Sequence, residues 1–367
     1  MGNMIALITL AGNSNYGNRL QAYALNRALS AYGTVVDARH EMGVTSLYTL
    51  CRRVARDKLA SLRASRGEEA VTPDQVRRQR FDAFYEDHFA PDVLLTSYTG
   101  LCGRGRAAGV AVLGSDQIWN YHWIPDADVA VLLGGFPNAP RCITYAASLG
   151  VDDIDEVHAP IFREHLSGLS AISVREFRAA EAISGLTDKP VEVVLDPTLL
   201  LAPGDWRALE PGFVPGGERY VLTYFLGEPS PAQEAIIQEE AARRGCGVRR
   251  VLDPRDPATL SAGPREFVEL FDRAECVFTD SFHACCFSIL FHRPFKVFDR
   301  AGMGGALSMN SRMETLFRLF ELDADMADGP LPAIDWGRVD SLLEGHRARS
   351  LAWLEAALGV PGEAARG

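Results

Sequence analysis

Short runs of apolar residues alternate along this chain with longer stretches in which apolar positions recur every three or four residues. A short apolar run is typical of a strand buried on both faces, and the longer spacing is typical of a helix with one buried face. Their alternation predicts parallel sheets covered by helices, which is the α/β class. The expected strands are 4–10, 35–37, 110–113, 142–146, 171–174, 191–195, 220–225, 248–251, 276–278 and 295–297.

The expected strands fall into two sets, which are separated by the stretch 197–206. Two sets in a chain of 367 residues predict two Rossmann-like, doubly wound domains that face a cleft, residues 1–200 and 201–367. The segment 52–90 is rich in Arg and Glu with spaced apolar residues, and it is expected to be a helical insert in the first domain. A C-terminal amphipathic helix is expected at 339–358.

Composition and charge narrow the classes of partner. The net charge is −11, which argues against a nucleic-acid backbone or an anionic membrane surface as the main partner. The apolar opening at 4–10 is too short to span a membrane, so we expect no stable membrane insertion. Seven scattered cysteines without CxxC spacing predict free thiols in a reducing compartment, the cytoplasm, and no structural zinc. No other residue pattern here predicts a metal site.

The most informative candidate for chemistry is Thr279-Asp280-Ser281-Phe282-His283, which lies between an apolar strand and an apolar helix at 284–291. Ligands of open α/β sheets bind outside the carboxyl ends of strands, so His283 is expected near a helix N-terminus that favours an anion. A carboxylate such as Asp280 would favour the charged imidazolium. The alternative is a helix capped by Asp280 or Ser281, with His283 packed in the core.

Two further segments follow expected strands of the first half. Asn13–Asn18 leads into a helix expected at 19–31 and can hold an anion or sugar hydroxyls, although it lacks the glycine spacing of nucleotide sites. The segment 114–120 places Asp116 as a candidate base, with Gln117 and Trp119 as candidates to hold and stack on a sugar ring. The alternatives are an Asn-capped turn and an Asx turn beside a buried Trp.

Cations at other strand ends are candidates for binding an anionic substrate. Arg175 ends a third strand and can clamp a carboxylate or phosphate, although an Arg-Glu pair with Glu176 is more often structural. Lys296 and Arg312 flank a glycine-rich stretch at 301–305 that predicts an anion-binding loop, with a solvated surface loop as the alternative.

These segments, taken in order, resemble the polysaccharide pyruvyl transferase family over nearly the whole chain. The matching pieces are Asn15-Tyr16-Gly17-Asn18-Arg19-Leu20-Gln21, Gly114–Trp119, Tyr145–Gly150, Ser173–Glu176, Leu195-Asp196-Pro197-Thr198, Thr279–His283 and Asn310-Ser311-Arg312. One departure is local, because Ala284 stands where the family usually has Gly after the histidine, and Cys285 and Cys286 follow it as expected packing residues.

The resemblance implies a fold like that of B-type glycosyltransferases, with phosphoenolpyruvate as co-substrate, a sugar acceptor in the cleft and His283 as general acid. The expected reaction is transfer of the pyruvyl group onto two hydroxyls of a sugar, a glycoside or a lipid-linked saccharide, giving a cyclic ketal and phosphate. The second domain is then the donor side and the first domain the acceptor side. No cofactor is expected. The candidate site residues are Asp116, Asp280 and His283 for catalysis; Arg175, Ser281, Lys296 and Arg312 for the donor; and Asn15, Asn18, Gln21, Gln117 and Trp119 for the acceptor.

Two alternatives from other classes stay open at the level of sequence. The first is a nucleotide-sugar-dependent glycosyltransferase, because a fold does not fix its chemistry. The second is a non-catalytic family member that binds carbohydrate, although the presence of His283 and Asp116 argues weakly against it.

Overall fold

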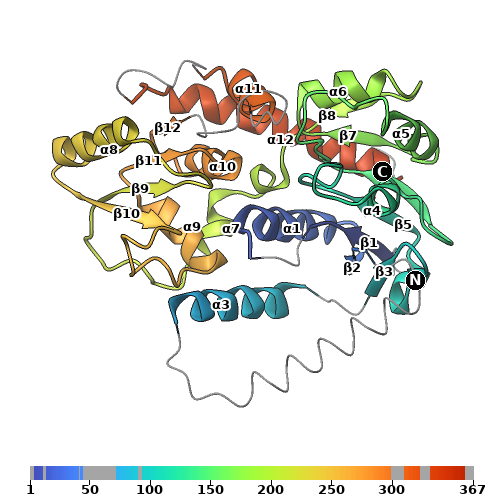
Figure 1. Cartoon of the computed structure of the whole chain (residues 1–367), viewed down its shortest axis with the longest axis horizontal. Coiled ribbons are helices and arrows are strands. Elements are labelled where there is room, and N and C mark those ends of the chain that lie inside the picture. Colours follow the sequence, from blue (N-terminus) through green and yellow to red (C-terminus); the bar gives the residue numbers. More distant parts are fainter. Residues whose placement is uncertain are drawn as a thin grey trace, which may run out of the picture.

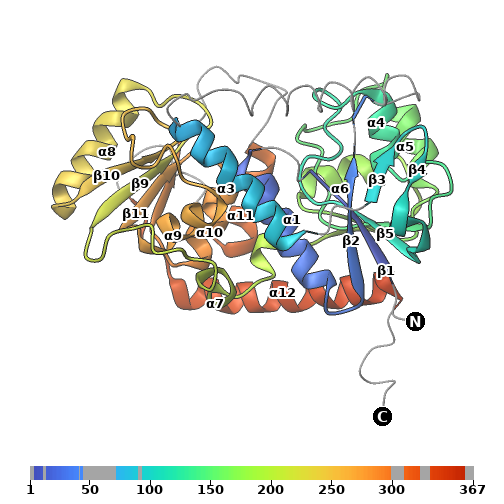
Figure 2. The same ribbon diagram turned by 90° about the horizontal axis from the view of Figure 1, so that it is seen from below.

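The chain forms two halves, each built on a parallel sheet, which lie side by side (Figures 1 and 2). The structure is a computed structural model and describes residues 4–10, 14–40, 42–43, 72–89, 93–298, 310–322 and 331–359. The first half lies on the right of Figure 1 and the second on the left, with helix α1 (Tyr16–Leu29) between them. The α/β class and the two sets of strands are confirmed.

The first half contains a six-stranded sheet in the order β4-β3-β2-β1-β5-β6, parallel except where β4 pairs with β3. Its strands are β1 (Met4–Ile8), β2 (Thr34–His40), β3 (Val93–Thr96), β4 (Gly100–Leu101), β5 (Val110–Leu113) and β6 (Arg141–Thr144). The sequence pattern did not predict β3 and β4. Strand β4 has only two residues and gives no hydrophobic period, whereas β3, Val-Leu-Leu-Thr, is an apolar run as long as β5 and was missed.

Strand β1 shows why the central strands read as uninterrupted apolar runs. Ile5 and Leu7 belong to the hydrophobic core that also includes α1, whereas Ala6 and Ile8 belong to the core on the opposite face. Side chains of a strand point alternately to the two faces, so a strand covered by helices on both sides needs apolar residues at every position.

Two further parallel strands, β7 (Ile172–Val174) and β8 (Val191–Val193), continue the first half beyond β6. Single bridges from Ile143 to Ala171 and from Ala147 to Val174 link them to the end of β6. The residues that follow β5, β6 and β7 therefore lie close together, and they include Asp116 and Arg175.

The second half contains a four-stranded parallel sheet in the order β10-β9-β11-β12. Its strands are β9 (Tyr220–Tyr224), β10 (Gly247–Val251), β11 (Cys276–Thr279) and β12 (Phe295–Val297). All four were expected from the apolar runs. The remaining helices among the described residues are α3 (Pro73–His88), α4 (Asp126–Leu132), α5 (Ala159–Leu166), α6 (Phe177–Ser184), α7 (Pro203–Arg207), α8 (Pro231–Arg244), α9 (Pro264–Arg273), α10 (Phe282–Leu290), α11 (Asn310–Phe320) and α12 (Trp336–Leu358), with short 3₁₀ turns η1 (Gly103–Ala107) and η2 (Pro197–Leu199).

The C-terminal helix α12 crosses from the second half to the first (Figure 2). Near its start, Asp340 contacts His292, which follows α10; at its end, Arg141 of β6 donates to the carbonyl oxygens of Ala357 and Leu358 at 2.7 and 2.8 Å. Gly359, with φ of +68°, ends the helix as expected. The domain boundary at residues 200 and 201 falls in the crossover around η2 and stays a prediction, because α12 contacts both halves.

Helix α3 covers the junction between the halves. Residues 52–71 and 90 of the predicted insert lie outside the described residues, as do the predicted anion loop at 301–305 and Arg300. Thr72 and Gln75 form a capping box that starts α3, and the buried side chains of Phe81 and Phe84 attach it to the core. The helix is therefore anchored by two aromatic side chains and is not simply a solvated surface helix.

Hydrophobic side chains join the two halves directly. Tyr16 at the start of α1 stacks on Phe267 of α9 with ring centroids 4.4 Å apart, and its hydroxyl donates to the carbonyl oxygen of Ala262 at 2.6 Å. Tyr16 is fully buried, and burial raises the pKa of its phenol well above the ordinary value. This contact fixes the first turn of α1 against the second half, which matters for the site described below.

The six described cysteines are free, as predicted, and Cys51 lies outside the described residues. Cys285 and Cys286 are fully buried in α10, and burial raises the pKa of both thiols, so they are packing residues. None of the described helices combines the length and the hydrophobicity that crossing a bilayer requires.

Candidate active site

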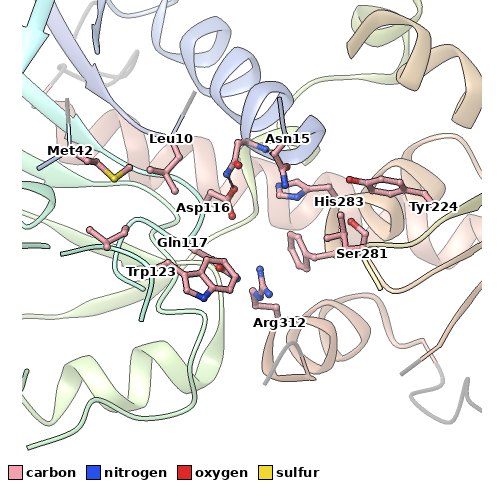
Figure 3. Close-up of a pocket in the computed structure, with 14 residues that line it drawn as sticks. Leu10, Asn15, Met42, Asp116, Gln117, Trp123, Tyr224, Ser281, His283 and Arg312 are labelled. Carbon is pink, nitrogen blue, oxygen red and sulfur yellow. Dashed lines mark hydrogen bonds between the residues drawn. The ribbon is translucent and has the colours of Figure 1, made fainter. Parts of the chain in front are cut away.

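A cavity of about 330 Å³ opens between the two halves, at the carboxyl ends of their parallel strands (Figure 3). Both halves contribute polar and apolar side chains to its lining. The lining residues are Leu10, Asn15, Asn18, Met42, Asp116, Gln117, Trp123 and Ile124 from the first half and Tyr224, Leu226, Ser281, Phe282, His283 and Arg312 from the second. Such a position, between two doubly wound sheets, is where this architecture holds ligands.

His283 reaches the cavity because the chain turns sharply between β11 and α10. Ser281 is the N-cap residue of α10, and its backbone N–H donates to the Thr279 hydroxyl at 3.0 Å. The Ser281 side chain makes no capping hydrogen bond to the first turn of α10, and Ser281, Phe282 and His283 all line the cavity. The sequence prediction of His283 beside a helix N-terminus is confirmed by this geometry.

The imidazole of His283 lies between an aspartate and a glycine of the other half. Its Nε2 is 3.6 Å from Oδ2 of Asp196, a carboxylate with no solvent exposure. On the other side of the ring, a Cβ atom placed on Gly17 would come within 2.2 Å of Nδ1. Only glycine at position 17 of α1 leaves room for this imidazole orientation.

Asp116 approaches from the loop after β5. Its backbone has φ of +68°, a left-handed conformation that a non-glycine residue rarely adopts, and its side chain lines the cavity. One carboxylate oxygen accepts a hydrogen bond from Arg175 Nη2 at 2.7 Å and the other accepts from the side-chain amide of Asn18. Strained backbone at a residue with this setting is a feature of functional sites.

Arg175 is the centre of a buried ionic cluster below the cavity. Its guanidinium donates to Asp116 Oδ1 at 2.7 Å and to Asp196 Oδ2 at 2.8 Å, and its Nε lies 3.8 Å from Glu176. The side chain has no solvent exposure and stacks at 4.7 Å on the ring of Phe282, the first residue of α10. Arg175 was predicted to bind the donor, but the structure turns it away from the cavity and toward the two aspartates.

The charges of this cluster shift the pKa values of its members. Burial raises the pKa of Asp116, but the positive charges of Arg175, His283 and Arg312 outweigh this and lower it below the ordinary value. Burial likewise opposes ionisation of Asp196, yet His283 and Arg175 hold its pKa well below the usual range. Both aspartates are therefore ionised at neutral pH, and Arg175 stays charged because its raised pKa reflects these two partners despite burial.

Arg312 and Gln117 form a pair across the cavity (Figure 3). With the Gln117 amide oriented so that its oxygen faces Arg312, that oxygen accepts from Nη1 and Nη2 at 2.7 and 2.8 Å. Arg312 comes from α11 in the second half and Gln117 from the loop after β5, so the pair spans the two halves. Both were predicted site residues, and both line the cavity.

The predicted amide residues separate into two layers. Asn15 and Asn18 line the cavity, and Asn15 Oδ1 caps α1 by accepting from the Asn18 backbone N–H at 3.1 Å. Gln21 lies behind them without solvent exposure, donates to Thr9 Oγ1 at 2.9 Å and accepts from the Ser115 hydroxyl at 2.8 Å. Gln21 thus ties the loop that carries Asp116 to α1 and does not reach the cavity.

Trp119 was predicted to stack on a sugar ring, but it lies in the core, and Trp123 lines the cavity. Trp119 has no solvent exposure, and its indole N–H donates to the carbonyl oxygen of Leu132 at 3.0 Å in the core of the first half. Trp123 lines the cavity and is 63% exposed. Sequence reasoning missed Trp123 because nothing local marks which of two tryptophans in an irregular loop points outward.

Asp280 and Lys296 also differ from their predicted settings. The carboxylate of Asp280 accepts from the backbone N–H groups of Leu226 and Gly227 at 2.7 and 2.9 Å, so it shapes the loop after β9. The aspartate that faces His283 is Asp196, which sequence reasoning quoted only as part of a motif. Lys296 is buried in β12 and does not line the cavity.

This arrangement places a proton donor, an anion-binding region and ionised carboxylates around one space. The imidazole of His283 can transfer a proton, while Arg312 and the first turn of α10 can bind negative charge. In the part of the chain that the structure describes, no group of three or more His, Cys, Asp or Glu side chains is arranged to hold a metal ion.

Comparison with known proteins assigns the sequence to one group of enzymes. The family model for polysaccharide pyruvyl transferase matches residues 15–301, and this range includes the segments after β5, β7 and β11 that build the cavity. No curated protein matches the sequence.

Several solved structures are similar in overall shape. UDP-GlcNAc 2-epimerase from Methanocaldococcus jannaschii is 13% identical with a TM-score of 0.43, covering 94% of this chain and 92% of that one. Anabaena Alr3699/HepE, solved with UDP and glucose, is 10% identical with a TM-score of 0.42, covering 95% and 94%. Arabidopsis thaliana UGT89C1, complexed with UDP-L-rhamnose, is 9% identical with a TM-score of 0.39, covering 99% and 96%.

Proposed function

This chain belongs to the polysaccharide pyruvyl transferase family, and on that premise we propose that it transfers the pyruvyl group of phosphoenolpyruvate to two hydroxyls of a sugar or glycoside. The products are a cyclic ketal and phosphate. The observation that carries the proposal is the setting of His283, between ionised aspartates and beside the anion-binding turn of α10, in a cavity lined by both halves.

The first step is protonation of the methylene carbon of phosphoenolpyruvate, which creates an oxocarbenium-like centre at the adjacent carbon. His283 supplies this proton, because imidazole is the side chain best suited to proton transfer near neutral pH and the carboxylate of Asp196 lies 3.6 Å from its Nε2. The negative charges of Asp116 and Asp196 stabilise the positive charge that develops on the donor.

The donor carries a phosphate and a carboxylate, so about three cationic or dipolar partners are needed in a partly dry cavity. Arg312, the first turn of α10 with Ser281, and protonated His283 supply three from the cavity wall. Arg175 and Lys296 do not line the cavity. Arg175 holds Asp116 and Asp196 in place, and Lys296 is buried in β12. The donor therefore lies on the side of the second half.

A sugar hydroxyl then attacks the oxocarbenium-like carbon and must lose its proton. Asp116 is the candidate base, since it lines the cavity from the opposite half. Its lowered pKa makes it a weak base, but attack on a cationic carbon makes the hydroxyl strongly acidic, so a weak base suffices. Loss of phosphate opens the same carbon to the second hydroxyl, which loses its proton in turn and closes the ketal.

The acceptor binds on the side of the first half. Asn15, Asn18 and Gln117 offer amide groups to sugar hydroxyls, and the exposed indole of Trp123 offers a flat surface for the apolar face of a pyranose. In this proposal Trp123, and not Trp119, stacks on the sugar ring. An acceptor that is soluble or lipid-linked and a location in the cytoplasm remain parts of the proposal.

The test is incubation of the purified protein with phosphoenolpyruvate and a panel of glycosides, following phosphate release and product mass. We expect phosphate release with a mass gain equal to one pyruvyl group, and a loss of about 10²–10⁴-fold in His283→Ala. His292→Ala is the matched control, because His292 is exposed on the surface and pairs with Asp340. Consumption of a sugar nucleotide without phosphate release from phosphoenolpyruvate would instead favour a glycosyltransferase, and failure to bind phosphoenolpyruvate would contradict the proposal.

A further inference from the structure

The two nitrogens of the His283 imidazole have different surroundings. Nε2 is shielded from solvent and makes no hydrogen bond, and Oδ2 of Asp196 lies 3.6 Å from it. Nδ1 lies next to Gly17 in the first turn of α1. That turn also carries Asn18, which lines the cavity together with the N-cap residue Asn15. Nε2 is thus the nitrogen of the protein interior, and Nδ1 is the nitrogen beside the turn whose residues line the cavity.

Asp196 is held rigidly in a position to fix this orientation. One of its oxygens accepts from the backbone N–H and the hydroxyl of Thr198 at 3.0 and 2.8 Å. The other accepts from Arg175 at 2.8 Å and faces His283. The side chain has no solvent exposure, and a 3₁₀ turn begins at Pro197 directly after it, so its partners in the structure are protein groups.

The contacts of Arg175 also favour a proton on the imidazole nitrogen that faces Asp196. The guanidinium is shared by three carboxylates, those of Asp116 and Asp196 at 2.7 and 2.8 Å and that of Glu176 at 3.8 Å, so Asp196 does not have its whole positive charge. An Nε2–H group facing Asp196 adds a further partner for that carboxylate in both protonation states of the ring.

We infer that Asp196 is a positioning residue that keeps the Nε2 proton on His283, so that Nδ1 is the atom that gives the proton to the substrate. This inference rests on the proposed function for the identity of the reaction. In the imidazolium both nitrogens carry a proton, and the Nδ1 proton passes to the methylene carbon as its π electrons form the new C–H bond. The ring that remains is the neutral Nε2–H tautomer, still held by Asp196.

Other charged and titratable groups also surround His283. Asp116 and Arg312 reach the same cavity from the loop after β5 and from α11, and Arg175 stands behind Phe282. Asp280 lies three residues before His283 on the same loop. Tyr224 lines the cavity from β9. These groups stay unchanged in the experiment, which alters Asp196 alone.

The decisive measurement is nitrogen NMR of the full chain labelled at its 8 histidines, with His283→Gln identifying the His283 signals. When the His283 ring is neutral, we expect the Nε2–H tautomer in the unaltered protein, and an Nδ1–H tautomer would overturn the inference. This measurement needs no substrate, so failure to observe pyruvyl transfer leaves it readable, and the two proposals can fail separately.

Asp196→Asn is the second arm. Asparagine no longer favours a proton on Nε2, so both tautomers of His283 should be populated in the nitrogen spectrum and kcat should fall. Asp196→Asn should have no further effect on activity in the His283→Gln background. Lower activity with an unchanged tautomer would mean a merely structural role and would overturn the inference.

The matched control is Asp256→Asn. Asp256 is also a largely buried carboxylate that accepts from a backbone N–H, at Arg250, and pairs with an arginine, Arg249, but it lies beside β10 and outside the cavity. We expect neither the tautomer of His283 nor kcat to change in this variant. If Asp196→Asn does not fold, the tautomer of the unaltered protein still decides the question.

Discussion

The floor of the cavity is ionic and buried, whereas its mouth is apolar and exposed. The floor consists of four buried residues that contact one another, Asp116, Arg175, Asp196 and His283. The mouth includes Trp123 and Leu226, which are 63% and 45% exposed. A side chain buried among charges can adopt few positions without leaving a charge unpaired, whereas an exposed apolar side chain can be replaced at low cost.

The floor and the mouth therefore serve different purposes. The floor holds a proton donor and carboxylates in fixed positions, as the chemistry of proton transfer requires. The mouth offers apolar surface that a sugar ring can cover, which bears on the choice of acceptor more than on the rate of the chemical step. Substitutions in the cavity floor should therefore lower kcat, and substitutions in the mouth should raise KM for the acceptor.

The largest effect is expected for Asp116→Asn. The amide keeps the shape of the side chain but cannot accept the hydroxyl proton, so we expect kcat to fall by about 10²–10⁴-fold while phosphoenolpyruvate still binds. Binding is measured by calorimetry and turnover by phosphate release. Retention of full activity would remove Asp116 from the mechanism.

Gly17→Ala should follow, with a large effect on activity and a small one on stability. The new methyl group must displace the His283 ring, because Nδ1 lies 2.2 Å from the position of that Cβ, and kcat should fall by about 10²-fold. Alanine is the better helix former by about 1 kcal/mol, which partly offsets a cost of about 1–3 kcal/mol for displacing the ring, so the melting temperature should fall only slightly.

The control for this substitution is Gly204→Ala in α7, where a Cβ meets nothing within 4 Å. It should leave kcat unchanged. Equal loss of activity in both variants would mean that the effect at Gly17 comes from the helix and not from contact with His283.

A smaller effect is expected for Trp123→Ala at the mouth. Loss of a stacking surface costs about 1 kcal/mol, so KM for the glycoside should rise by about 5–10-fold with kcat nearly constant. Steady-state kinetics with varied acceptor measures this split. Trp123→Phe should recover part of the affinity, and a fall in kcat without a change in KM would mean that the mouth takes part in the chemistry.

The smallest effect concerns stability in acid. The folded-state pKa values of Asp116 and Asp196 lie below those of the unfolded chain, so their contribution to stability is present above the ordinary aspartate pKa and is lost as the pH falls through the folded-state values. Asp116→Asn should therefore flatten the fall of melting temperature below about pH 4, by roughly 2–4 °C.

Glu176 shifts in the opposite direction, because burial raises its pKa, and it is left unchanged in this comparison. Asp256→Asn, at a carboxylate outside the cluster, is the control and should keep the acid slope of the unaltered protein. An acid slope that is the same in Asp116→Asn would show that the cluster does not govern acid stability.

Much of the fold followed from the sequence. The apolar run at 110–113 coincides with β5 and the run at 276–278 falls within β11, because strands covered on both faces need apolar residues at every position. The position of His283 after β11 and at the start of α10 also followed, since a strand and a helix with clear hydrophobic patterns leave only the short segment between them. Strand β4 has only two residues and shows no pattern, whereas β3 is an apolar run that was missed.

The partners of the site residues were decided by the tertiary structure. Local sequence placed Asp280 nearest to His283 along the chain, but the docking of the two halves brought Asp196 to its imidazole, while the carboxylate of Asp280 holds the loop after β9. Likewise the left-handed turn at Asp116 is followed by burial of Trp119 and exposure of Trp123.

The sequence by itself therefore determined which elements form, their order and the strand ends at which polar residues accumulate, because these depend on hydrophobic periodicity over a few neighbouring residues. Only the tertiary structure decided that Gly17, Asp196 and His283 meet. That contact depends on how α1 packs between the two halves, and no local pattern encodes the distance between residues so far apart in the chain.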